Sequence, residues 1–253
     1  MGHAASFALQ KMRAMNTKPN IRLVYTIVIL LSLIGAAVVV RRTLNLVPVL
    51  VNGYHAPAPT TNSTIAQFRK VDDIFARYPV LTLIHILPAL FFIAIGPFQF
   101  NKNIRNKYPQ WHRRMGRVFL ICGMIIGITG FVMSIVMPAI GGVNQAASTI
   151  MFSMFFLYAL YKAFRYIRKG NSILHREWMI RAYAIGLAVA TIRPIIGVFF
   201  ATSRFTGLTP YEFFGTGFWI GFVLHLIIAE AWIYRTRKPS PDIEAFKQKR
   251  NAA

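Results

Sequence analysis

Six apolar stretches, each long enough to cross a lipid bilayer, constrain this chain more than any other feature of its sequence. A membrane-spanning helix needs about 20 mostly apolar residues, because the hydrocarbon core is about 30 Å thick. Of the 253 residues, 55% are hydrophobic, which leaves little chain for a soluble domain. The sequence therefore predicts an all-α, polytopic bundle of six transmembrane helices. The predicted spans are Leu23–Val40, Val80–Phe100, Arg117–Met137, Ala146–Phe164, Trp178–Ala201 and Phe213–Tyr234.

Segments rich in lysine and arginine alternate along the chain with segments that contain few of them. The formal net charge is +22, which in a soluble protein would suggest a nucleic-acid partner. Most lysines and arginines lie in the two chain tails and in the loops after the second and fourth spans, whereas residues 138–145 carry none. The positive-inside rule therefore predicts that both termini are cytoplasmic. The charge indicates topology and contact with anionic lipids, and we expect no nucleic-acid partner.

This topology divides the chain into a membrane domain and two tails. Residues 1–22 are predicted to form a cytoplasmic basic tail, residues 23–234 the six-span domain, and residues 235–253 a second cytoplasmic basic tail. Residues 41–79 form the first outer loop, irregular in its first part. Its second part predicts a short amphipathic helix on the membrane surface. The apolar face of that helix consists of Ile65, Phe68, Val71, Phe75 and Tyr78.

Few ionisable residues lie within or at the edges of the predicted spans. Because such groups are costly inside a bilayer unless paired, they are the functional candidates. They are His85, His112, His175, His225, Arg193 and Glu230. At 100° per residue each histidine shares a helix face with small residues, as His225 does with Gly221. Helices approach closely along such faces, so we expect all four imidazoles to point into the bundle.

The four histidines fall at two depths of the predicted bundle. His85 lies in its outer half and His225 nearer the middle of the bilayer, and these form an outer pair, whereas His112 and His175 are at the cytoplasmic surface. A di-haem cytochrome b requires this layout, since each iron takes two imidazoles from facing helices. On this hypothesis His85 and His225 are iron ligands of a haem b, and Arg193 binds a haem propionate. His112 and His175 are then a second ligand pair, or a site for a lipid or quinone head group.

Two other interpretations stay open. An intramembrane histidine is often only an interhelical hydrogen-bond donor, which predicts a non-enzymatic accessory, assembly or transport protein. Alternatively, the two histidine–arginine loops contact lipid head groups. A paired-acid mechanism is disfavoured, because only Glu230 of the seven carboxylates lies in a span, where a neighbouring arginine is its expected partner. Whether the protein is an enzyme, as a component of a membrane oxidoreductase, stays open. A quinone or a redox protein is the partner expected besides the bilayer.

Four short motifs carry a resemblance to a known family. They are Gly96–Phe100, Tyr108–Arg117, His175–Arg181 and Glu230–Trp232. With these motifs, residues 80–234 resemble the bacterial predicted membrane proteins catalogued as domain of unknown function 2306. The resemblance implies a helical multi-pass protein of the bacterial inner membrane, and it implies no activity. The histidine layout is in addition similar to that of membrane cytochromes b, which pass electrons across or along the bilayer.

Overall fold

The computed structural model describes residues 20–56 and 63–237, and the side chains of residues 63–68 and 70 are not described. The two predicted basic tails lie almost wholly outside these residues. The described chain is helical, as predicted. Its helices are α2 (Ile21–Asn52), α3 (Ser63–Ala76), α4 (Pro79–Gln99), α5 (Lys102–Lys107), α6 (Pro109–Val136), α7 (Gly142–Arg168), α8 (Ser172–Thr206) and α9 (Pro210–Thr236).

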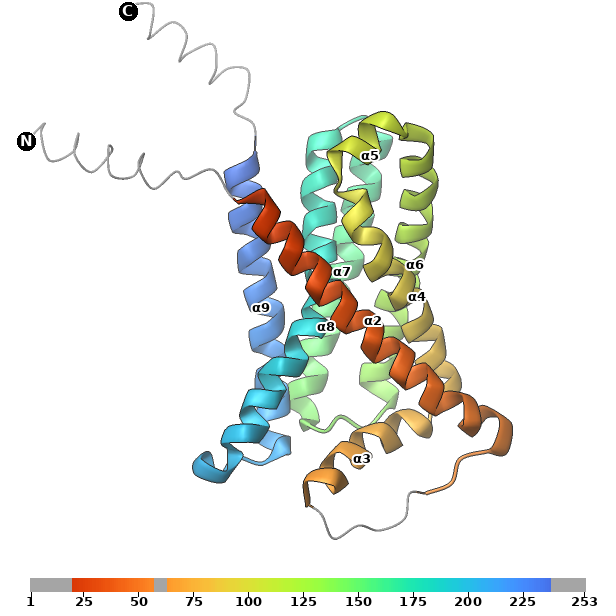
Figure 1. The fold of residues 1–253 in the computed structure, drawn as a ribbon, viewed down its shortest axis with the longest axis vertical. Coiled ribbons are helices and arrows are strands. Elements are labelled where there is room, and N and C mark those ends of the chain that lie inside the picture. The colour runs from red at the N-terminus through yellow and green to blue at the C-terminus, as the bar shows by residue number, and fades with distance from the viewer. Residues whose placement is uncertain (1–19, 57–62, 238–253) are drawn as a thin grey trace, which may run out of the picture.

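Six of these helices, α2, α4 and α6 to α9, are long and apolar enough to cross a membrane. This confirms the predicted six-span, all-α class. The short helices α5 and α3 lie at opposite ends of the bundle (Figure 1). We call these the α5 end and the α3 end. Because the number of spans is even, α2 begins and α9 finishes at the α5 end.

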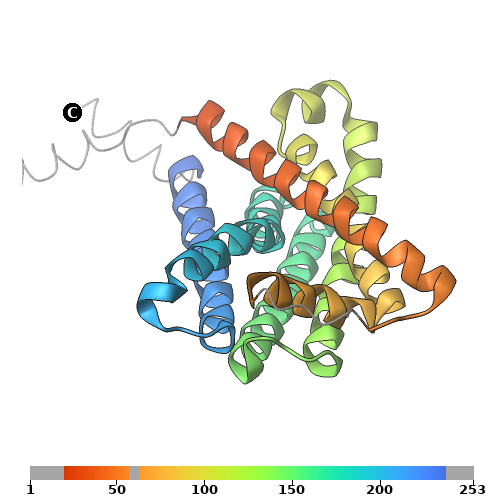
Figure 2. The same ribbon diagram turned by 60° about the horizontal axis from the view of Figure 1, so that its bottom comes forward.

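Helices α4, α6, α7 and α8 form a four-helix core. In it α4 packs against α6, α6 against α7, and α7 against α8, while α8 closes the ring against α4. Helices α6 and α8 are therefore at opposite corners. Helix α2 crosses obliquely over α4 and α8, and α9 packs on α8 and α7 (Figures 1 and 2). Helices α4 and α9 consequently lie on different sides of the core.

Aromatic rings packed against glycines fill the middle of this core. Phe92 stacks on Phe119 with ring centroids 4.1 Å apart and meets Phe156 edge-on at 5.5 Å. A Cβ atom on Gly186 would lie only 2.5 Å from the Phe92 ring, and one on Gly96 would overlap a tyrosine ring of α8. The small-residue faces therefore point inward, as predicted, because bulky rings occupy the space that the glycines leave.

Helix α2 extends well beyond its predicted span. The sequence predicts an end at Val40 and an irregular chain thereafter, but the helix continues to Asn52. Asp72 of α3 pairs with Arg41 (3.2 Å) and Arg42 (2.6 Å), and the Arg42 guanidinium lies 4.1 Å from the centre of the Phe75 ring. Asp72 thus pairs with the two arginines at which the predicted span ends, while the helix continues past them. Helix α3 is the short helix predicted for this loop.

Candidate functional site

The candidate site lies at the α5 end, where His112 and His175 extend from the first turns of α6 and α8. Helix α8 begins where the Asn171 side chain accepts a hydrogen bond from the Leu174 N–H (3.0 Å), so His175 is helical and turned inward. Helix α6 begins at Pro109, which fixes His112 similarly. The two imidazoles are near enough to interact electrostatically, although their helices occupy opposite corners of the core.

The ring nitrogens of this pair differ in their partners. His175 Nδ1 lies 2.9 Å from the Ala163 carbonyl oxygen, which only accepts hydrogen bonds. Nδ1 therefore carries the proton, and Nε2 keeps its lone pair. His112 Nδ1 is buried with no hydrogen-bond partner among the described residues, and so is Nε2 of Gln99 at the end of α4. Each such group costs about 1–3 kcal/mol, so the structure holds two unsatisfied polar atoms at this end.

Arginines give this site a positive electrostatic environment. Arg105 of α5 interacts electrostatically with His112 and with Arg176. Arg176 donates a hydrogen bond to the Thr236 hydroxyl of α9 (2.8 Å), which fixes its guanidinium beside the site. The arrangement of two imidazoles and two guanidinium groups is suited to an anionic ligand that presents a flat or metal-bearing centre between α6 and α8.

Two ion pairs beside the site join α8 to α9. Arg237 donates to both carboxylate oxygens of Glu177 at 2.8 and 2.7 Å, and Glu177 is only 1% exposed. Arg181 forms a bidentate ion pair with Glu230 in the same way, at 2.5 and 2.9 Å. The predicted pairing of Glu230 with a neighbouring arginine is thus confirmed. Sequence reasoning missed Glu177, although it lies inside the motif that contains His175.

The structure does not bring His85 and His225 together. His85 Nδ1 donates to the Thr129 hydroxyl of α6 (2.9 Å), which in turn donates to a carbonyl oxygen of its own helix. His225 Nε2 shares a hydrogen bond with Thr191 of α8 (2.8 Å). One contact joins α4 to α6 and the other joins α9 to α8, and sequence reasoning missed both threonines. The geometry does not favour these two histidines as ligands of one haem, and that assignment stays a prediction.

Phenylalanines fill the interior between the two helices that carry His85 and His225. Phe92 of α4 meets Phe156 of α7, and one turn away Phe152 stacks on Phe222 of α9 with centroids 4.5 Å apart. Arg193, the predicted propionate partner, instead lies at the α3 end, where it interacts electrostatically with Arg41 and Asp72. Among the described residues, no three His, Cys, Asp or Glu side chains gather as a metal site. A haem iron needs only two protein ligands.

Six apolar helices that enclose a basic, polar site at one end define a multi-pass integral membrane protein. Residues 82–233 match the family described as "Predicted membrane protein (DUF2306)", and the chain belongs to that family. The resemblance given by the sequence motifs is thereby confirmed over nearly the same range. Comparisons with curated proteins and with solved structures find no match.

Proposed function

We propose that this protein transfers electrons in the bacterial inner membrane and binds haem b through His112 and His175. The observation that supports the proposal most is the hydrogen bond from His175 Nδ1 to the Ala163 carbonyl oxygen. Histidines that bind a metal usually donate their other ring N–H to such an acceptor, which fixes the tautomer and orients the ring. Nε2 of His175 is left as the ligating atom.

The fold supports this pair in two further ways. Imidazoles from opposite corners of a four-helix core bind a cofactor from its two sides, as cofactor sites in helical bundles do. His112 and His175 extend from such corners, and His112 Nδ1 has no partner among the described residues. Both observations support the proposal of a bis-histidine haem at this end.

The surrounding residues would hold the group and exclude water. Arg105 and Arg176 would bind the propionates through charge-assisted hydrogen bonds. Phe119, fully buried two turns below His112, separates the site from the middle of the membrane. Haem b supplies a one-electron couple. A quinone or a redox protein that contacts the α5 end would exchange electrons there.

We place the α5 end on the cytoplasmic side. The positive-inside rule supports this orientation, because basic residues crowd the short connections at that end. They include Lys102, Arg105, Lys107, Arg113, Arg114, Lys162, Arg165, Arg168 and Lys169. The site would then face cytoplasmic electron donors.

Absorption spectroscopy tests the haem proposal. The protein is produced with haem supplied, purified in detergent, and measured as a reduced-minus-oxidised difference spectrum. We expect a b-type spectrum that disappears in His112→Ala and in His175→Ala and persists in the double variant His85→Ala/His225→Ala. Free imidazole should restore the spectrum to His175→Gly, a rescue that a merely structural histidine would not show.

Two outcomes would contradict the proposal. A spectrum lost only in the double variant would return the ligands to His85 and His225, as the sequence alone predicts. A colourless wild type that elutes as a folded species would end the haem hypothesis altogether. It would favour the second candidate, a non-enzymatic membrane accessory whose histidines tie helices together. The hydrogen bonds from His85 to Thr129 and between His225 and Thr191 support that candidate.

A further inference from the structure

A second group of arginines lies at the α3 end, between α2, α3 and α8. Arg41 and Arg42 of α2 both pair with Asp72 of α3. Arg193 of α8 interacts electrostatically with all three of these residues. We call Arg41, Arg42, Arg193 and Asp72 the arginine cluster. Two of the three guanidinium groups share the carboxylate, and the cluster as a whole has a net charge of about +2, from three arginines and one aspartate.

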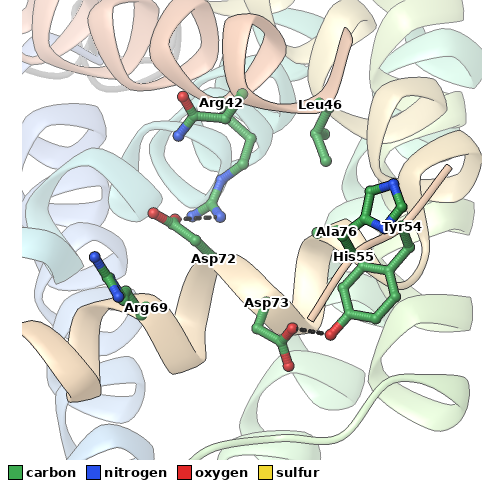
Figure 3. Close-up of a pocket in the computed structure, with 9 residues that line it drawn as sticks. Arg42, Leu46, Tyr54, His55, Arg69, Asp72, Asp73 and Ala76 are labelled. Atoms are coloured by element: carbon green, nitrogen blue, oxygen red, sulfur yellow. Dashed lines mark hydrogen bonds and ion pairs between the residues drawn. The ribbon is translucent and has the colours of Figure 1, made fainter. Parts of the chain in front are cut away.

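The neighbouring carboxylate does not offset this excess. Asp73 accepts a hydrogen bond from the Tyr54 hydroxyl (Figure 3) and pairs with Arg77 at 2.9 Å, so its charge is already matched by an arginine outside the cluster. Arg42 itself is only 4% exposed, so part of the excess charge is removed from water. Charge held in this way calls for an anionic partner, since desolvating a guanidinium without a counter-ion is costly.

The depth of the cluster matches the phosphate layer of a bilayer. Arg193 lies roughly 30 Å along α8 from its start at the α5 end, at 1.5 Å per residue. This distance equals the thickness of the hydrocarbon core, about 30 Å. The guanidinium groups are therefore expected at the opposite hydrocarbon boundary, where lipid phosphates lie.

The cluster borders a polar cavity, and an apolar groove follows on the same helix. The cavity measures about 180 Å³ and is lined by Arg42, Arg69, Leu46 and the two carboxylates Asp72 and Asp73, among others (Figure 3). The groove measures about 420 Å³ and lies between α2, α4 and α6, with Leu50 in its wall. Leu46 lines the cavity and Leu50 the groove, so the two spaces lie beside successive turns of α2. This pairing suits an amphiphile better than a free ion.

We propose that the arginine cluster binds the phosphate of an anionic lipid, whose acyl chain lies in the groove along α4. Arg42 and Arg193 bind the phosphate oxygens from α2 and α8. Arg41 keeps Asp72 paired, so that the carboxylate does not compete. The lipid joins α2, α3 and α8 at an end where few side chains do so. This site is separate from the haem site and does not depend on it.

Native mass spectrometry tests this proposal with the full chain. The protein is transferred from mixed micelles of phosphatidylcholine and phosphatidylglycerol, and bound lipid is counted for wild type, Arg193→Gln and Arg193→Lys. We expect the wild type to retain phosphatidylglycerol and Arg193→Gln to bind it about tenfold more weakly, because one charge-assisted hydrogen bond is lost. Arg193→Lys should recover part of this loss in affinity, because it keeps the positive charge. Arg204→Gln is the matched control, because Arg204 is an exposed arginine on the same helix at the same end.

A groove variant and a competitor separate a lipid from a free ion. Leu87→Trp narrows the groove and should weaken phosphatidylglycerol binding, whereas excess inorganic phosphate should displace little of the lipid. Displacement by inorganic phosphate, with no effect of Leu87→Trp, would identify a free-anion site and overturn the lipid proposal. Equal retention by Arg193→Gln and Arg204→Gln, or of phosphatidylcholine and phosphatidylglycerol, would overturn it as well.

Discussion

The two ends of the bundle use the same charged side chains for different purposes. At the α5 end each buried or half-buried carboxylate has its own arginine, and both pairs join one membrane-spanning helix to another. At the α3 end several arginines share Asp72, which belongs to a short helix outside the bundle. Glu177 keeps 2% of its side chain exposed, whereas Asp72 keeps 34%. At the first end each carboxylate is paired between two spans, whereas at the second end one carboxylate is shared between arginines.

This difference indicates which ion pairs stabilise the whole bundle and which stabilise only α3. Ion pairs that link two spans stabilise the bundle itself, because breaking one leaves a charge in a low-dielectric interior. Ion pairs that hold a surface helix stabilise only that helix, since water reaches the groups when they part. We therefore expect changes at the α5 end to affect the whole fold and changes at the α3 end to affect α3 alone.

The largest effect is expected from Arg237→Ala, with Arg41→Ala as its counterpart. Both arginines are similarly exposed, 56% and 58% of the side chain, but their partners differ. Without Arg237, Glu177 is left buried, at a cost of about 3 kcal/mol. Without Arg41, Asp72 keeps Arg42, and we expect a loss of about 0.5 kcal/mol. Reversible unfolding in mixed detergent measures both free energies. Equal losses in the free energy of unfolding would show that ion pairs at the two ends contribute equally to stability.

Local sequence patterns predict much of this architecture and little of its pairing. Hydropathy predicts the six spans, and the small residues in register with His225 correctly predict that it faces inward. The partners Thr191, Arg237 and Asp72 were not predicted, because each comes from a helix distant in sequence and leaves no periodic signal. The extension of α2 to Asn52 was missed as well. Contacts between helices that are distant in sequence determine these partners, and composition and periodicity do not predict such contacts.

A smaller effect is expected from replacing two glycines of α8 by alanine. Gly186 lies in the four-helix core, and Gly197 lies nearer the α3 end. A Cβ added at Gly186 would approach the Phe92 ring, which is held by its stack on Phe119, whereas a Cβ at Gly197 meets no atom within 4 Å. Gly186→Ala should therefore cost about 2 kcal/mol through overpacking. Gly197→Ala should leave stability unchanged or raise it by up to about 1 kcal/mol, through helix propensity. Unfolding of both variants under the same conditions gives the comparison.

The opposite result would be informative about the α3 end. If Gly197→Ala destabilises the protein as much as Gly186→Ala, α8 must pack closely beyond Pro194, against a neighbour such as a second copy or a bound lipid. A lipid-dependent loss would then support the proposed site, because it would appear in anionic micelles and vanish in neutral detergent.

The smallest effect is expected at Tyr54, which tests how α3 is attached. The hydrogen bond from its hydroxyl to the Asp73 carboxylate raises the Tyr54 pKa above its ordinary value, and Asp73 also raises the pKa of Arg77. A group whose pKa is raised on folding contributes stability below its unfolded pKa, here about 10, and loses it as the pH rises through the folded value. On the alkaline side, the attachment of α3 should thus weaken above about pH 10.

Ultraviolet titration of the wild type minus that of Tyr54→Phe isolates this one phenol among the tyrosines. We expect it to ionise later than a free tyrosine, and to return toward the ordinary value in Asp73→Asn, because the acceptor that favours the protonated form is gone. Earlier ionisation in the wild type would mean that Arg77 and the arginine cluster outweigh Asp73. Positive charge would then dominate around Tyr54 as well, and the excess that we assign to the arginine cluster would extend to this residue.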